Sequence, residues 1–418
     1  MNRRSFLRDT LACAGAAAGA SCVRTNTQPK PFANLTPMTV DVTPIAGDER
    51  QARIERARQL MRDRGVDAMF LESGSSLFYY TGVRWGRSER PFGVVIPVRG
   101  EPAWVAPAFE EQRAWELLPP ATDLRVWQED ESPYRVLAGI LRDRGAAVGR
   151  IGIEESVRFF VYDGVRSEMG RAQFVSATPV TAEGRMIKSP AEIALLERAN
   201  AITLRAIDAA MRTLRPGMSQ HELAANVSAA TSALGGDDDG ALVAFGKESA
   251  FPHGSSKRQA LREGDVVLVD AGCRLQGYVS DVTRTIVYGT PTQRQRDVWD
   301  VEKRAQRAAF EAAHPGATCE SVDAAARRVI TEAGFGPGYK LPGLPHRTGH
   351  GIGLDGHEWT NLVKGNVATL EPGMCFSDEP TIAIYGEFGI RLEDCLHITE
   401  KGPVFFTAQS ESIDKPFG

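Results

Sequence analysis

An antiparallel hairpin is the feature that most restricts how this chain can fold. Two stretches rich in β-branched and aromatic residues, 266–271 and 278–288, lie on either side of the segment Cys273–Gly277. Strand-forming stretches around a short turn that contains glycine are typical of a β-hairpin. The sequence therefore predicts an antiparallel sheet in the second half of the chain.

The same hairpin carries two acidic residues. If its turn centres on Leu275 and Gln276, Asp270 lies opposite Asp281. Opposed residues of an antiparallel pair point to the same face, with Cβ atoms about 5 Å apart. Two carboxylates held so close would repel each other unless a cation lay between them. We therefore interpret the hairpin as half of a metal site.

Length and charge bound the class of protein. The chain has 418 residues, long enough for two domains, and its 24% charged and 42% hydrophobic residues are typical of a globular protein. The formal net charge is −4, and acidic and basic residues are interspersed. This balance gives no positively charged surface that would attract nucleic acid, so we expect no nucleic-acid partner.

The first residues, 1–22, resemble a twin-arginine export signal. Arg3 and Arg4 precede Phe6 and Leu7, and an alanine-rich apolar stretch follows. The stretch is too short and too weakly apolar to span a membrane. We therefore expect export by the twin-arginine route and a periplasmic location.

Two outcomes remain open at the end of this signal. The small residues Ala18–Ala20 fit a signal-peptide cleavage site, whereas Cys22 would allow lipidation and hence a membrane anchor. Residues 23–48 are rich in Thr, Pro and Asn and are interpreted as a tether. The four later cysteines lack metal-ligand spacing, and we expect them to be buried free thiols.

The remaining chain divides into two domains. Alternating strand and helix patterns predict an α/β domain over 49–182. Residues 185–418 then combine helices with antiparallel strands, which favours an α+β domain. Ser189 begins a helix with a capping box, and further helices are expected near 293–313 and 319–333. The glycine-rich acidic segment Gly235–Gly240 is interpreted as a loop.

A second acidic hairpin lies near the C-terminus. The strands expected at 374–379 and 389–398 flank a turn around Gly386. With Gly386 at the turn centre, Glu379 lies opposite Glu393, so this hairpin also points two carboxylates to one face.

A segment rich in glycine and histidine connects the two hairpins. His346, His350 and His357 lie among several glycines, which argues against a helical zinc motif and favours an extended segment. Glycines let the backbone approach a metal closely, so His350 or His357 can reach it. A polar surface loop is the alternative.

The charges of these residues suggest which metals fit. Four carboxylates and one neutral imidazole sum to −4, which two divalent cations would neutralise. Oxygen-rich ligands with one nitrogen suit Mn²⁺ above all, with Co²⁺, Fe²⁺ or Zn²⁺ as alternatives. Two metals about 3.5–4 Å apart would bridge a water, lower its pKa and hold a hydrolytic intermediate.

Taken in order, the motifs resemble the pita-bread metallopeptidase family, in its branch of aminopeptidase P, prolidase and creatinase. They are Val269–Gly272, Asp281–Thr285, Gly349–Gly353, Glu379–Pro380 and Arg391–Asp394. The resemblance implies an α+β pita-bread catalytic domain preceded by a smaller α/β creatinase-type N-terminal domain. It also implies hydrolysis of peptides with proline at the second position, by an aminopeptidase or a dipeptidase, and a homodimer.

The resemblance further assigns roles to single residues. It implies metal ligation by Asp270, Asp281, His350, Glu379 and Glu393, of which Asp281 and Glu393 bridge both ions. In addition, Glu379 acts as the general base, His357 stabilises the carbonyl oxygen and His253 assists the leaving nitrogen. His346 and Arg391 are implied to contact the substrate.

Two departures from the family pattern keep other functions open. Thr381 and Ala383 stand where the family has Gly and Tyr, and Asp378 stands where it has an apolar residue. One alternative is therefore a metal-dependent lyase or amidohydrolase on the same fold. A less favoured one is an inactive binding module, against which the complete ligand set argues.

Overall fold

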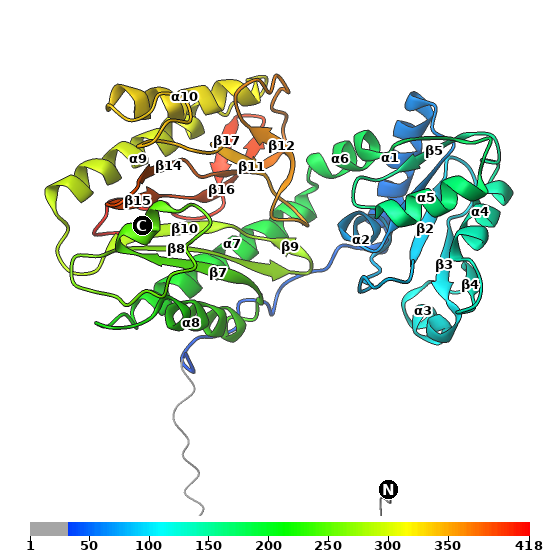
Figure 1. The fold of residues 1–418 in the computed structure, drawn as a ribbon, viewed down its shortest axis with the longest axis horizontal. Helices are drawn as coiled ribbons and strands as arrows, with labels where there is room; N and C mark the ends of the chain where they lie inside the picture. The colour runs from blue at the N-terminus through cyan, green and yellow to red at the C-terminus, as the bar shows by residue number, and fades with distance from the viewer. Residues whose placement is uncertain (1–31) are drawn as a thin grey trace, which may run out of the picture.

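The computed structural model describes residues 32–418 and contains two domains joined near residue 188 (Figure 1). The expected export signal, with its cleavage site and Cys22, lies outside the described residues. No helix within 32–418 is long and apolar enough to cross a membrane.

The N-terminal domain is a mixed sheet covered by helices. Its strand order is β4-β3-β2-β1-β5-β6, with β2 antiparallel to both neighbours and the remaining pairs parallel. The strands are β1 (Ala68–Glu72), β2 (Gly93–Pro97), β3 (Ala103–Pro107), β4 (Asp123–Trp127), β5 (Arg150–Ile153) and β6 (Gln173–Ser176). The helices are α1 (Gly47–Arg64), α2 (Ser75–Thr81), α3 (Glu111–Leu117), α4 (Pro133–Asp143), α5 (Phe159–Glu168) and α6 (Thr178–Met186).

The C-terminal domain packs antiparallel sheets between two helix pairs (Figure 1). Helices α7 (Pro190–Met211) and α8 (Gln220–Ala233) cover the sheet of β7 (Asp237–Phe245), β8 (Val266–Leu275), β9 (Tyr278–Val279) and β10 (Val282–Val287). Helices α9 (Gln293–Ala312) and α10 (Cys319–Glu332) cover the remaining strands. These are β11 (Gly349–Gly351), β12 (Glu358–Leu362), β13 (Cys375–Asp378), β14 (Thr381–Ile384), β15 (Phe388–Arg391), β16 (Asp394–Thr399) and β17 (Gly402–Phe405).

Helix α7 begins as the sequence predicts. The Ser189 side chain accepts from the Glu192 backbone N–H, and the Glu192 carboxylate accepts from the Ser189 N–H, which completes a capping box. Helices α9 and α10 also lie at the predicted positions. The predicted loop Gly235–Gly240 is wrong in part, because β7 begins at Asp237 and pairs with β8 through an irregular register.

The first hairpin forms, but its predicted register is wrong. The turn is Gln276–Gly277, both with positive φ (50° and 100°), as a two-residue hairpin loop requires. Asp270 therefore lies opposite Thr283 and not opposite Asp281. Asp281 precedes Thr283 by two residues, so the two aspartates still share a face as diagonal neighbours.

The second hairpin has the predicted register. Strand β14 pairs with β15 so that Thr381 lies opposite Arg391, and β13 pairs with β16 so that Asp378 lies opposite Asp394. Both ladders have the same register, so Glu379 and Glu393 oppose each other in the gap between them.

Part of the predicted tether is packed against the C-terminal domain. The Met38 N–H donates to the Leu234 carbonyl at the end of α8 (2.8 Å), and Asp41 pairs with Arg198 of α7 (2.8 Å). Phe32, Leu35, Met38 and Val42 also pack on the hydrophobic core. Residues 32–46 are therefore not a free tether, because their apolar side chains gain burial on the domain surface.

Candidate metal centre

The predicted metal ligands come together from five places in the strands of the second domain. Asp270 lies within β8, and Asp281 occupies the break between β9 and β10. His350 is the central residue of β11, whereas Glu379 follows β13 and Glu393 precedes β16. An isolated bridge between Thr283 and Glu393 joins the sheet of the first hairpin to that of the second, which positions the two acidic pairs against each other.

The ligand atoms are close enough to share a cation. The His350 Nε2 atom lies 3.0 Å from Glu379 Oε1 and 3.8 Å from Asp281 Oδ2. One ligand atom each from Asp281, His350 and Glu393 lies within 4.8 Å of the others. The His350 ring is itself fixed, since its Nδ1 atom contacts the Gly351 carbonyl at 3.1 Å.

The electrostatics of this cluster call for positive charge. Burial raises the pKa of Asp281, and the nearby Glu393, Asp270 and Glu379 raise it further. Burial, followed by Glu379 and Asp270, likewise raises the pKa of Glu393. A divalent cation would favour the charged forms of all four carboxylates. The donor set of carboxylate oxygens with one imidazole nitrogen thus fits divalent metal ions.

Arg391 lies beneath the carboxylates, with 3% of its surface exposed. Its guanidinium pairs with Asp270, and its Nε atom donates to Thr283 Oγ1 (3.0 Å). The Nη1 atom donates to the Pro252 carbonyl (3.2 Å). Because these donors are engaged, Arg391 holds Asp270 in position, and the expected substrate contact stays a prediction.

The three other predicted histidines surround the cluster. The ring centroid of His357 lies 4.1 Å from that of His350, and burial together with His350 and Arg347 lowers the His357 pKa to about 4. His346 is held on both sides, by the Arg347 carbonyl (2.7 Å) and by Thr381 Oγ1 (3.0 Å). His253 lies in the exposed loop after η2 (Gly246–Ala250), next to the Pro252 carbonyl that Arg391 anchors.

The departures from the family pattern have distinct structural consequences. Thr381 holds the His346 ring, so the replacement of Gly at this position fixes a histidine beside the metal centre. Asp378 is 1% exposed, and burial, then Asp394 and Glu302, raise its pKa. Strand alternation turns Asp378 toward α9, away from the metal ligands. Ala383 is fully buried.

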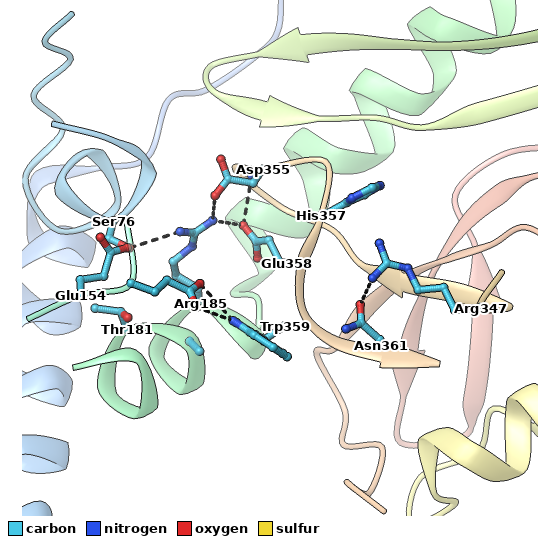
Figure 2. Close-up of a pocket in the computed structure, with 12 residues that line it drawn as sticks. Ser76, Glu154, Thr181, Arg185, Arg347, Asp355, His357, Glu358, Trp359 and Asn361 are labelled. Carbon is cyan, nitrogen blue, oxygen red and sulfur yellow. Dashed lines mark hydrogen bonds and ion pairs between the residues drawn. The ribbon is translucent and has the colours of Figure 1, made fainter. Parts of the chain in front are cut away.

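Sequence reasoning missed the charged residues around His357 (Figure 2). Arg185 of α6 pairs with Asp355 (2.6 Å) and with Glu358, which also pairs with Lys188 (2.9 Å). Farther along the same wall, Arg347 donates to Asn361 Oδ1 (2.7 Å). The two acidic residues lie within two positions of His357 in the sequence, but nothing in the sequence indicates that α6 supplies their partner.

Comparisons with known proteins identify the family. Residues 194–400 match the Metallopeptidase family M24, and residues 53–187 match the Creatinase/Prolidase N-terminal domain.

Relatives and solved structures agree with both matches. The Xaa-Pro dipeptidase of Lactobacillus helveticus is 32% identical, over 86% of this chain and 98% of its own length. The crystal structure of dipeptidase PepE from Mycobacterium ulcerans superposes with a TM-score of 0.81 at 32% identity, and the match covers 88% of this chain and 98% of that one. For a prolidase from Thermococcus sibiricus the TM-score is 0.79 at 29% identity, and the match covers 86% of this chain and 97% of that one. The chain therefore belongs to the metallopeptidase family M24, with the pita-bread catalytic domain and the creatinase-type N-terminal domain that its sequence predicts.

Proposed function

We propose that this chain is a manganese-dependent Xaa-Pro dipeptidase that acts as a homodimer after export. It is a metallopeptidase of the Xaa-Pro-cleaving type, to which its relatives named Xaa-Pro dipeptidase and prolidase belong. The observation that supports the proposal is the cluster of Asp281, His350 and Glu393, with Glu379 3.0 Å from His350 and Asp270 on the same face. Mn²⁺ is proposed because oxygen ligands dominate the cluster.

The residues of the chain can perform the steps of peptide hydrolysis. Two divalent ions, when bound, would supply Lewis-acid activation of water and of the scissile carbonyl. Glu379 would accept the proton of the attacking water. His357 is neutral at pH 7, since its pKa is about 4, and can donate one hydrogen bond to the developing oxyanion. His253 then hydrogen-bonds the leaving proline nitrogen.

The two other functions considered are not favoured. A metal-dependent lyase or amidohydrolase would be suggested by Asp378 and Ala383, whereas the complete ligand set argues against an inactive binding module. Asp378 turns toward α9, and Ala383 is buried in β14. Neither residue removes a group from the metal centre.

The function is tested by the products released from short peptides. Protein stripped of metal and reloaded with Mn²⁺ is incubated with Ala-Pro, Ala-Pro-Ala and Ala-Ala, and metal content is measured alongside. We expect two Mn²⁺ per chain and release of proline from Ala-Pro alone. Cleavage of Ala-Pro-Ala at a similar rate would identify an aminopeptidase, and cleavage of none would contradict the peptidase assignment.

Export is a separate part of the proposal. It rests on Arg3 and Arg4 before an apolar stretch, and the signal then ends either in cleavage after Ala20 or in lipidation of Cys22. Replacing both arginines with lysine should retain the full-length chain in the cytoplasm, as cell fractionation would show. If the Cys22→Ser variant remains in the membrane fraction, lipidation at that residue is excluded.

A further inference from the structure

Two sets of side chains border the candidate metal centre. A cavity of about 290 Å³ lies between the two domains beside His357, and Glu154 and Thr181 line it from the N-terminal domain (Figure 2). His346 borders the centre from within the catalytic domain, because the Glu379 carboxylate is close enough to act on its pKa. The surroundings of this histidine differ from those that the family pattern provides.

Both ring nitrogens of His346 have a partner in the protein. The Nδ1 atom lies 2.7 Å from the Arg347 carbonyl, which can only accept, so Nδ1 carries a hydrogen. Burial lowers the pKa of His346 below its ordinary value of 6.5, although Glu379 opposes this effect, so the ring is neutral at pH 7. The Nε2 atom of a neutral ring then has a lone pair, and Thr381 Oγ1, at 3.0 Å, donates to it. The half-buried ring therefore keeps no free donor or acceptor.

The side chain of Thr381 is fixed in this position. It is 2% exposed, and its hydroxyl has no other hydrogen-bond partner within residues 32–418. Strand β14 also holds the segment that leads to His346, since Gly343 and Ala383 exchange two backbone hydrogen bonds of 3.0 and 3.2 Å. Thr381 stands where the family has Gly, which has no hydroxyl to donate. The occupied Nε2 atom thus follows from a departure of this chain from the family pattern.

His346 lies on the proline side of the proposed substrate. His253, which is proposed to bond the leaving nitrogen, is near enough to lower the pKa of His346. Thr381 lies opposite Arg391 in the pairing of β14 with β15, so both side chains point to the face of the metal ligands. The leaving residue of an Xaa-Pro substrate therefore meets a ring whose two nitrogens are both occupied.

We propose that Thr381, acting through His346, determines a preference for an apolar ring at the second substrate position, an inference that rests on the proposed function. With Nε2 occupied, His346 offers the substrate carbon atoms and no hydrogen bond. The pyrrolidine ring of proline needs no hydrogen bond, whereas a hydroxyl on that ring would lose water without gaining a partner. A buried hydroxyl without a partner weakens binding, so the site discriminates against hydroxyproline.

The test compares alanyl-proline with alanyl-hydroxyproline. The wild-type Mn²⁺ enzyme should cleave the proline dipeptide with a kcat/KM about 10-fold above that of the hydroxyproline dipeptide, chiefly through KM, as expected for one unpaired hydroxyl. Thr381→Val removes the hydroxyl at nearly constant volume and frees Nε2 to accept from the substrate, so this ratio should fall by about 5-fold or more. Thr381→Ser keeps a hydroxyl and should keep the ratio. Thr231→Val, the same substitution at a buried position of α8, is the matched control and should behave as wild type.

A spectroscopic measurement tests the contact itself, without turnover. Long-range proton–nitrogen correlation spectra of the Zn²⁺-loaded protein distinguish a ring nitrogen that bears hydrogen from one that accepts, and His346→Phe identifies the signals. We expect hydrogen on Nδ1 and a hydrogen-bonded Nε2 in wild type and in Thr381→Ser. The Nε2 signal should move toward that of an unbonded nitrogen in Thr381→Val. Hydrogen on Nε2 in the wild-type protein would overturn the inference.

A double variant shows whether Thr381 acts through His346. In the His346→Phe background there is no Nε2 atom, so Thr381→Val should change the ratio no further. An equal fall of the ratio in that background contradicts the inference, as does a wild-type enzyme that cleaves both dipeptides alike or a Thr381→Val variant that keeps the full preference. In these three cases the proposed function stands. If wild type cleaves neither dipeptide, the proposed function fails and the inference fails with it.

Discussion

At the residue scale, Asp281 is the side chain on which both proposed metal positions depend. It lies within reach of His350, and its pKa responds to three other carboxylates. Asp281→Ala should therefore reduce bound Mn²⁺ from two ions per chain to none, as elemental analysis of dialysed protein would show. The control is Asp300→Ala on the exposed surface of α9, which should retain both ions. Retention of one tightly bound ion by Asp281→Ala would contradict a bridging role.

His357 should affect turnover and not metal content. Its ring packs against His350 but is proposed to bind the substrate oxygen. Loss of one oxyanion donor typically lowers kcat by about 10²- to 10³-fold, and we expect a decrease of that size for His357→Ala. Steady-state kinetics on Ala-Pro together with metal analysis would check this. Loss of metal from the variant would show that His357 is a ligand instead.

At the element scale, Glu358 fixes the start of β12 just after His357. Burial would raise its pKa, but Arg185 and Lys188 outweigh this effect and hold it at about 2, against an ordinary value of 4.5. A lowered carboxylate pKa gives stability that is complete above about pH 4.5 and is lost as the pH falls toward 2. The contribution at neutral pH is on the order of 3 kcal/mol.

The Glu358→Gln variant measures that contribution. Its free energy of unfolding, from urea titrations, should lie below that of wild type at pH 7, and the difference should shrink as the pH is lowered toward 3. A difference that is independent of pH would mean that the Glu358 charge does not stabilise the fold.

The hairpins show which parts of the structure the sequence could predict. Gly386 lies at the middle of its three-residue turn, as the sequence predicts. This turn centre was enough to predict that Glu379 lies opposite Glu393. The register predicted for the first hairpin was wrong, because Gln276 adopts a positive φ that its residue type does not favour. The turn therefore lies one residue later than predicted. Strand β7 was missed because its acidic, glycine-containing start is held by pairing with β8 and not by local propensity.

The motifs around the metal ligands were predictable because each is local, whereas their surroundings are assembled from distant segments. Arg185 and Glu358 are 173 positions apart, and the pair depends on how the two domains meet. Arg391 was expected to contact the substrate, and the sequence does not show that its guanidinium donates to Thr283 and to the Pro252 carbonyl.

At the scale of the whole molecule, the two domains share one hydrophobic core. A single cluster of buried residues runs from Leu77 and Tyr80 of α2 to Leu195 of α7 and Tyr278 of β9. Interfaces between domains are often polar and permit relative motion. The continuous core here favours a fixed arrangement, so the cavity beside His357 keeps both of its walls.

Arg53 of α1 is the ionic anchor of this interface. Its guanidinium donates to the Tyr79 carbonyl (3.1 Å) and to the Tyr278 hydroxyl (3.2 Å), and it pairs with Glu192 of α7 (3.4 Å). Both Arg53 and Glu192 are buried, at 7% and 2% exposure. Removing one member of a buried pair leaves the other charge uncompensated, which costs about 3–5 kcal/mol.

Arg53→Met should therefore loosen the two domains from each other. We expect one cooperative transition in calorimetry for wild type and for Arg56→Met, which alters an exposed arginine of the same helix. For Arg53→Met we expect a lower unfolding temperature and a separate early transition of the N-terminal domain. Because Glu154 and Thr181 line the cavity from that domain, kcat/KM for Xaa-Pro dipeptides should fall as the early transition is approached. A single transition at the wild-type temperature would show that the apolar core alone joins the domains.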